Sequence, residues 1–188
     1  MKRVAVFASG SGTNAERITR YFENHLKVKI EIILSNRKDA YVLERAKTLN
    51  VPTKVFSREQ LVKSPGVVDW LKNMKIDLVV LAGFLWLIPD NLLSAFPSGI
   101  VNIHPALLPK YGGENMYGAK VHQSVIDAGE KESGITIHFV DEIYDHGEVI
   151  FQARCSVSKN ETHETLAKKI HELEHKHYPE VIEKLLIG

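Results

Sequence analysis

Short runs of apolar, mostly β-branched residues alternate with helix-like segments through the first half of the chain. These runs lie at residues 4–7, 28–34, 51–55, 78–82 and 99–103. Apolar residues at helical spacing lie between them at 15–25 and 40–49, and Ser57 with Gln60 forms a capping-box pattern that begins a further helix. Strands that are apolar on both faces and separated by helices are typical of a parallel sheet covered on both sides. The pattern predicts an α/β fold with a doubly wound, mostly parallel sheet.

The second half of the chain has a different pattern. It predicts a loop at 111–113, a helix at 121–128 and two neighbouring strands at 135–140 and 149–157. Thr162 is expected to cap a long C-terminal helix that ends near residue 186. The apolar residues at helical spacing that should face inward are Leu166, Ile170, Leu173, Val181 and Leu185. We therefore expect a mixed C-terminal part with a long C-terminal helix, within a single domain of residues 1–188.

Composition narrows the class of protein. Hydrophobic residues make up 44% of the 188 residues and charged residues 25%, which is the balance of a globular protein. Lys and Arg number 24 against 23 Asp and Glu, so the sequence lacks the basic surplus of a nucleic-acid binder. Its longest apolar runs are shorter than the roughly 18 residues of a membrane span. The single cysteine, Cys155, cannot form an internal disulfide, and with the short apolar N-terminal run this predicts a cytoplasmic protein.

A glycine-rich turn separates the first strand from the first helix, in the sequence Ser-Gly-Ser-Gly-Thr-Asn at residues 9–14. Glycines allow close backbone approach, and the free N–H groups at a helix N-terminus attract an anion such as phosphate. A plain tight turn with Thr13 as N-cap and Glu16 as its capping-box partner is the alternative. The turn fits the relaxed form of the dinucleotide fingerprint, but the second strand ends in Ser35 and Asn36 without an acidic residue. A monophosphate is therefore favoured over a nicotinamide cofactor.

A histidine pair near the C-terminus matches a zinc-protease motif. His171, Glu172 and His175 form the pattern H-E-x-x-H on the last expected helix. A zinc protease also needs a third protein ligand on a separate element, normally downstream. Because no such element follows here, we interpret the segment as a polar helix face and expect no metal, although Glu174 is a candidate to point into a site.

Asn102 and His104 lie two residues apart at the end of a buried strand, so their side chains should share one face. Ligands of open α/β sheets gather beyond the carboxyl ends of such strands, which makes the pair a candidate for catalysis. Asp145, in the turn between the last two strands, would raise the pKa of His104 if it folded against the imidazole. The alternatives are a strand-end histidine bonded to a carbonyl and an aspartate that caps its own loop.

Three segments together resemble a known family. They are residues 6–14, the run N-I-H-P-A-L-L-P from Asn102 to Pro109, and residues 138–147 with Asp145 and Gly147. In this order they are similar to the folate-dependent formyltransferases, and within them to the phosphoribosylglycinamide formyltransferases, or glycinamide ribonucleotide transformylases, of purine biosynthesis. The resemblance covers essentially the whole chain. It implies a Rossmann-like formyltransferase fold and transfer of a formyl group from 10-formyltetrahydrofolate, as co-substrate, to the amine of 5-phosphoribosylglycinamide.

The resemblance also implies roles for individual residues. The implied catalytic residues are Asn102, His104 and Asp145. The implied nucleotide contacts are Gly12, Thr13, Asn14 and Glu174, the last in a segment that matches E-H-x-x-Y-P. The implied folate contacts are Arg58, Leu85, Trp86, Leu87, Ile88 and Asn102. Residues of about 1–100 would then form a nucleotide- and phosphate-binding half, and about 101–188 a catalytic and folate-side half.

The chain departs from the family pattern at two places. Trp86 stands where the family often has arginine, and residues 112–118 replace a more usual P-G-x-x-x-x-H stretch. His122 matches a family histidine, to which we assign no catalytic role. Small-molecule substrates and a monomer or homodimer are expected. The alternative functions are a 10-formyltetrahydrofolate hydrolase and a non-catalytic module that binds a phosphate ligand, and a methionyl-tRNA formyltransferase would need a further tRNA-binding domain.

Overall fold

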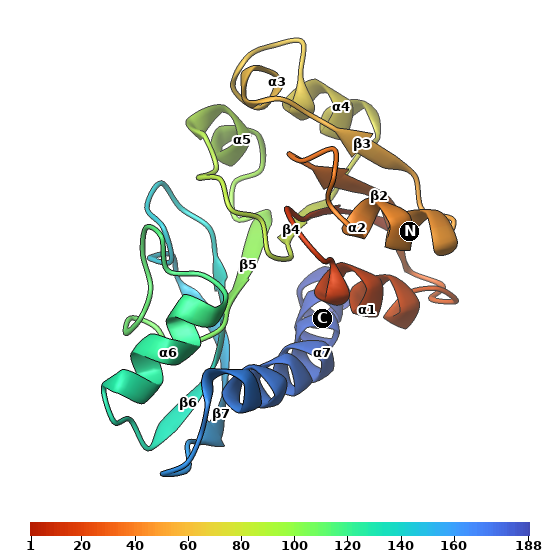
Figure 1. Cartoon of the computed structure of the whole chain (residues 1–188). Coiled ribbons are helices and arrows are strands. Elements are labelled where there is room, and N and C mark those ends of the chain that lie inside the picture. Colours follow the sequence, from red (N-terminus) through yellow and green to blue (C-terminus); the bar gives the residue numbers. More distant parts are fainter.

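The computed structural model describes all of residues 1–188 and contains one seven-stranded sheet in the order β3-β2-β1-β4-β5-β6-β7 (Figure 1). The strands are β1 (Lys2–Phe7), β2 (Val28–Ser35), β3 (Thr53–Val55), β4 (Leu78–Leu81), β5 (Ile100–His104), β6 (Glu132–Phe139) and β7 (Val149–Ser156). Strands β3, β2, β1, β4 and β5 are parallel, whereas β6 runs antiparallel to β5 and β7 antiparallel to β6. The predicted mostly parallel sheet with a mixed C-terminal part is therefore confirmed.

Helices cover both faces of this sheet. They are α1 (Thr13–Tyr21), α2 (Val42–Thr48), α3 (Arg58–Val62), α4 (Val67–Asn73), α5 (Asp90–Ala95), α6 (Ala119–Asp127) and α7 (His163–Ile187). Side chains of β1 alternate between two cores: Val4 and Val6 pack with α1, α2, α6 and α7, while Ala5 and Phe7 pack with α3, α4 and α5. This two-sided burial explains the uninterrupted apolar run at residues 4–7 of β1. None of the helices is long and apolar enough to cross a lipid bilayer.

The two predicted helix starts are confirmed by their caps. The Ser57 hydroxyl accepts from Gln60 N and the Gln60 side chain accepts from Ser57 N, while Thr162 caps α7 in the same reciprocal way with Thr165. One predicted inward residue is wrong: Leu185 is 37% exposed, because the buried stripe of α7 instead passes through Glu174, Tyr178 and Ile182.

Tyr178 joins α7 to the two central strands. Its hydroxyl lies 3.0 Å from the carbonyl oxygen of Leu81 on β4 and 3.1 Å from that of Val101 on β5, and the side chain is fully buried. These carbonyls immediately precede Ala82 and Asn102, so the contact fixes the strand ends that lead into the site. Phenylalanine at this position would leave the buried carbonyls without this donor.

Tyr178→Phe is therefore expected to lower the free energy of unfolding by about 1–3 kcal/mol. Urea unfolding measures the change, with the exposed Tyr41→Phe as the matched control that should leave stability within about 0.5 kcal/mol of wild type. Equal stability of the Tyr178→Phe variant and the control would contradict this account of α7 docking.

Candidate active site

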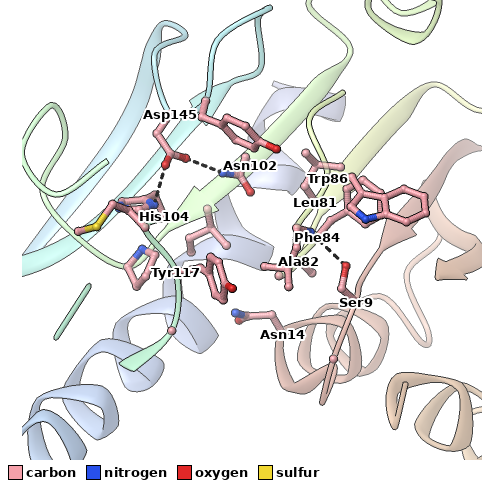
Figure 2. Close-up of a pocket in the computed structure, with 18 of the residues that line it drawn as sticks. Ser9, Asn14, Leu81, Ala82, Phe84, Trp86, Asn102, His104, Tyr117 and Asp145 are labelled. Atoms are coloured by element: carbon pink, nitrogen blue, oxygen red, sulfur yellow. Dashed lines mark hydrogen bonds and ion pairs between the residues drawn. The ribbon is translucent and has the colours of Figure 1, made fainter. Parts of the chain in front are cut away.

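A cavity of about 450 Å³ opens at the carboxyl ends of β1, β4 and β5. Figure 2 shows Ser9 and Asn14 on one side of it and His104 with Asp145 on the other, with Ala82 and Phe84 between them. Strands β2 and β4 lie on opposite sides of β1 in the sheet. In open α/β sheets a crevice generally lies at the carboxyl ends of the strands where the strand order changes direction in this way. The cavity therefore brings the glycine turn and the polar strand end into one space.

The glycine turn presents unbonded N–H groups to the cavity. Gly12 is the N-cap of α1 and has a φ of 75°, a left-handed conformation that favours glycine. A Cβ at this position would also collide with the side chain of Val42. The backbone N–H groups of Gly12, Thr13 and Asn14 have no acceptor within the protein. The left-handed turn and its free N–H groups are those expected for an anion site, and anion binding itself stays a prediction.

The alternative role of Thr13 as a side-chain cap is wrong. Thr13 is the first residue of α1 and no side chain caps this helix. Glu16, the expected capping-box partner, instead accepts from Arg20 Nη2 at 2.9 Å and pairs with Arg45. The pKa of Glu16 is lowered, first by the Arg20 hydrogen bond. The first turn of α1 is consequently left open toward the cavity.

Ser9 ties the glycine turn to the segment that follows β4. Its hydroxyl donates to Asn36 Oδ1 at 2.7 Å and accepts from the backbone N–H of Leu85 at 3.0 Å. Figure 2 shows this side chain beside Phe84. The turn at residues 9–14 and the apolar segment at 85–88 are thus held in fixed positions relative to each other.

Glu174 is a buried acid that faces the glycine turn. It lines the cavity, is 6% exposed, and accepts from Asn14 Nδ2 at 2.9 Å through Oε2. Burial raises the pKa of Glu174 to about 7, and the Asn14 hydrogen bond only partly opposes this. Asn14 Oδ1 is buried without a partner, so both side chains have capacity left for hydroxyl or amine groups of a ligand.

This buried acid gives stability a specific pH dependence. Since the pKa of Glu174 is higher in the folded protein than in the unfolded chain, its contribution to stability is lost as the pH rises through about 7. Glu174→Gln removes this ionisation. The variant is expected to gain about 2–3 kcal/mol of unfolding free energy relative to wild type between pH 5 and pH 8.

Urea unfolding at the two pH values measures this gain. Glu172→Gln, at an exposed position of the same helix, is the matched control and should follow the wild-type pH profile. A Glu174→Gln variant that loses stability with pH as steeply as wild type would contradict the buried ionisation.

Asn102, His104 and Asp145 meet at the other end of the cavity. Asp145 Oδ2 lies 3.3 Å from His104 Nδ1, and Asp145 Oδ1 accepts from Asn102 Nδ2 at 3.4 Å, as the dashed lines in Figure 2 mark. Asn102 and His104 both line the cavity, which confirms their shared face, and the approach of the Asp145 loop to His104 is confirmed as well. Asp145 also accepts from Gly113 N at 3.0 Å through Oδ2.

The expected rise in the pKa of His104 is wrong. The imidazole is 3% exposed, and this burial lowers its pKa below the usual value more strongly than the Asp145 charge raises it. Burial also acts to raise the pKa of Asp145, but bonds and charges from His138, His104 and Gly113 together lower it. At neutral pH the pair is therefore a neutral imidazole beside a carboxylate.

Both nitrogens of the His104 ring face acceptors. Nε2 lies 2.8 Å from the carbonyl oxygen of Tyr111, and Nδ1 faces Asp145. A neutral imidazole has one N–H and can satisfy only one of these contacts, whereas an imidazolium satisfies both. The geometry therefore suits a ring that gains a proton during a reaction and is stabilised while it carries it.

His138 is a member of this cluster that the sequence analysis did not assign. It lies on β6 directly opposite Asn102 in the strand register, and its Nε2 is 3.1 Å from Asn102 Nδ2 and 3.7 Å from Asp145 Oδ1. Its Nδ1 donates to the carbonyl oxygen of Phe139 at 2.7 Å, so Nε2 is the acceptor. The signal was a polar residue at an otherwise buried strand position, and only the pairing register shows its partner.

One wall of the cavity is apolar. The residues expected there, Leu85, Trp86, Leu87 and Ile88, all line it. Phe84 and Trp86 pack edge to face with ring centroids 6.2 Å apart. Arg58 does not line the cavity, and its guanidinium carbon instead lies 5.4 Å from the centre of the Trp86 ring.

Residues 113–118 and His122 line the cavity near His104. The side chain of His122 is buried, its Nδ1 has no partner, and burial lowers its pKa to about 4. The rings of the H-E-x-x-H pair, His171 and His175, stack with centroids 6.2 Å apart. No group of three or more His, Cys, Asp or Glu side chains is arranged to hold a metal ion.

Comparison with known proteins identifies relatives along nearly the whole chain. The sequence profile of the formyl transferase family matches residues 2–182. A chloroplastic phosphoribosylglycinamide formyltransferase of Arabidopsis thaliana is 42% identical over 96% of this chain, which spans 64% of that relative. The phosphoribosylglycinamide formyltransferase of Bacillus subtilis is 38% identical over 99% of this chain and 95% of its own length.

Solved structures agree with the sequence relatives. The phosphoribosylglycinamide formyltransferase of Bacillus halodurans superposes with a TM-score of 0.88 at 39% identity, covering 100% of this chain and 96% of its own. Glycinamide ribonucleotide transformylase 1 of Geobacillus kaustophilus gives a TM-score of 0.88 at 40% identity and covers 99% of both chains.

Proposed function

Because the chain belongs to the formyl transferase family, we propose that it transfers the formyl group of 10-formyltetrahydrofolate to the amine of 5-phosphoribosylglycinamide, a step of purine biosynthesis. One observation carries this proposal. The glycine turn, the Asn102–His104–Asp145 cluster and the apolar residues 85–88 line the same cavity. A nucleotide and a flat heteroaromatic donor can therefore be held side by side, which supplies much of the rate of a two-substrate reaction.

The glycine turn and Glu174 would bind the nucleotide. The free N–H groups of Gly12, Thr13 and Asn14 suit its phosphate. The orphaned Asn14 Oδ1 and the buried Glu174 carboxyl suit the ribose hydroxyls or the glycinamide end, which offer hydrogen-bond donors. With the phosphate at the turn, the amine can extend along the cavity toward His104.

The folate co-substrate would lie against the apolar wall. Residues 85–88 provide an apolar slot for its pterin ring, and Arg58 beside Trp86 is exposed near the site, where it can attract the carboxylate tail. The residues present therefore fit this co-substrate, which supplies an activated formyl carbon. No step in this proposal requires a metal ion.

The catalytic cluster would move one proton and stabilise one negative charge. The unprotonated nitrogen of neutral His104 would have to turn from its protein acceptor to the attacking amine to take the proton that the amine loses, and the contact kept by the other nitrogen would stabilise the resulting imidazolium. The ring then returns that proton to the leaving folate nitrogen. Asn102 Nδ2 redirects the hydrogen of its long 3.4 Å contact to the developing oxyanion, while its contact to His138 keeps the amide in place.

An assay of folate release separates the candidate functions. The purified protein is mixed with 10-formyltetrahydrofolate, with and without 5-phosphoribosylglycinamide, and the unformylated folate is measured. We expect release that depends on the nucleotide. Release at the same rate without it indicates a hydrolase, and no release with either mixture indicates a binding module, so either result contradicts the proposal.

The proposed partners are these two small molecules alone. The near-zero net charge gives no electrostatic attraction to a nucleic acid. We place the reaction in the cytoplasm, since the only cysteine is half-buried on β7 and cannot form an internal disulfide.

A further inference from the structure

A second cavity, of about 300 Å³, is lined in part by the segment that follows β5. We call this segment, residues 107–111, the strap. Two hydrogen bonds to the sheet hold it in place. Leu108 N donates to Thr136 Oγ1 on β6 at 3.0 Å, and Gln152 Nε2 on β7 donates to the Leu108 carbonyl at 3.1 Å. The strap lines the second cavity along one side, while the active-site cavity begins beyond it at His104. In the sequence, the strap lies between Pro105 and Gly113, which both line the active-site cavity.

The inner part of the second cavity combines apolar side chains with one unsatisfied hydroxyl. Leu107, Leu108 and Val125 supply the apolar surface. Ser133 also lines the cavity, is 2% exposed, and its Oγ is buried without a hydrogen-bond partner.

Two exposed ion pairs lie at the mouth of the cavity. Lys110 Nζ lies 2.7 Å from Glu130 Oε1, and Arg154 Nη1 lies 3.1 Å from Glu132 Oε2. The second pair is well exposed on both sides, and such pairs contribute little to stability, so their members can change partners readily. Each carboxylate uses a single oxygen in these pairs, which leaves an acceptor free on both.

We propose that this second cavity binds an amino acid with an apolar side chain in its zwitterionic form. A simple anion would approach Glu130 and Glu132 as well as the two cations, and a simple cation would meet Lys110 and Arg154. Only a ligand that carries both charges is attracted by every charged group of the mouth. Its side chain fills the apolar inner part beside Leu107 and Val125, and the cavity size suits a small molecule.

Tyr111 connects this ligand site to the active site. Its ring lines the second cavity and its hydroxyl donates to Glu130 Oε1 at 2.9 Å, while its carbonyl oxygen faces His104 Nε2 at 2.8 Å. Tyr111 also has a φ of 58°, a left-handed conformation that is unfavourable for a tyrosine and is held by its surroundings. A ligand that engages Glu130 therefore acts on the residue that orients His104.

Calorimetric titration of the full chain tests the site without any formyl transfer. L-Leucine, L-valine and L-phenylalanine are the probes, and leucine amide and 4-methylpentanoate are the analogues that lack one charge. We expect the amino acids to bind and each analogue to bind at least about ten-fold more weakly. Arg154→Ala and Glu130→Gln should weaken leucine binding to the same extent, whereas Glu59→Gln, an exposed carboxylate on α3, should not change it.

Two further measurements define the outcome. Binding of leucine should be unaffected by saturating 5-phosphoribosylglycinamide, and it should shift the NMR signals of the His104 imidazole, assigned with His104→Ala. Absence of binding by all three amino acids, equal binding of the analogues, or competition with the nucleotide would each overturn the proposal. Unchanged His104 signals on binding would overturn the connection through Tyr111. Loss of formyl transfer alone would refute the proposed function and leave this site intact.

Discussion

Replacement of His104 by alanine is expected to lower kcat for formyl transfer by about 10²–10⁴-fold, with a much smaller change in KM for either substrate. The imidazole faces a carboxylate at 3.3 Å and a carbonyl at 2.8 Å through its two nitrogens, so it can hold the proton released by the amine. Without it, that proton must pass to water. Steady-state kinetics with both substrates varied measures kcat and the KM for each substrate separately.

The same substitution in a distant histidine provides the control. His163, at the exposed start of α7, lies outside the cavity, and His163→Ala should keep wild-type kcat. Because His104 is buried, urea unfolding of each variant is compared as well. A folded His104→Ala protein with wild-type kcat would remove His104 from the mechanism.

Asp145→Asn is expected to lower kcat by about 10²–10⁴-fold for a different reason. The Asp145 charge opposes the effect of burial on the pKa of His104, so its loss lowers that pKa further and weakens the ring as a base. An asparagine Nδ2 facing His104 Nδ1 would also stabilise the tautomer with its proton on Nε2. The lower limb of the pH–rate profile should consequently move to lower pH.

The backbone at residue 145 tolerates this change. Its φ of 54° lies in the left-handed region, which asparagine adopts more readily than most residues, and an amide oxygen can still accept from Gly113 N. Asp127→Asn, on α6 outside the cavity, is the matched control and should keep both kcat and the pH profile. A wild-type pH–rate profile for Asp145→Asn would show that the carboxylate does not act on the imidazole.

The central strands β1 and β4 could be predicted because their apolar residues are buried on both faces. Residues 4–7 pack against helices on either side, which leaves a continuous apolar run in the sequence. The helices α4 and α5 have no such signal. They span seven and six residues, too few for a helical period to stand out, and neither N-cap residue, Gly66 or Pro89, provides a side-chain cap.

The site was predictable where one element holds the residues together. Asn102 and His104 share a strand face, and the glycine turn joins a strand to a helix, so both follow from local spacing. The contact of His138 with Asn102 depends on the register of β6 against β5, which no single strand specifies. Burial lowers the pKa of His104 and the nearby Asp145 charge raises it, so the direction of the net shift depends on their balance. That balance could be found only from the actual surroundings of the ring.

The central claim is that the formyl carbon moves directly to the amine of the nucleotide within one cavity. A donor labelled with ¹³C in its formyl group, incubated with the protein and 5-phosphoribosylglycinamide, tests it by NMR of the products. We predict one labelled formamide on the nucleotide for each unformylated folate released. Label recovered as free formate, with the nucleotide amine unmodified, would contradict the account.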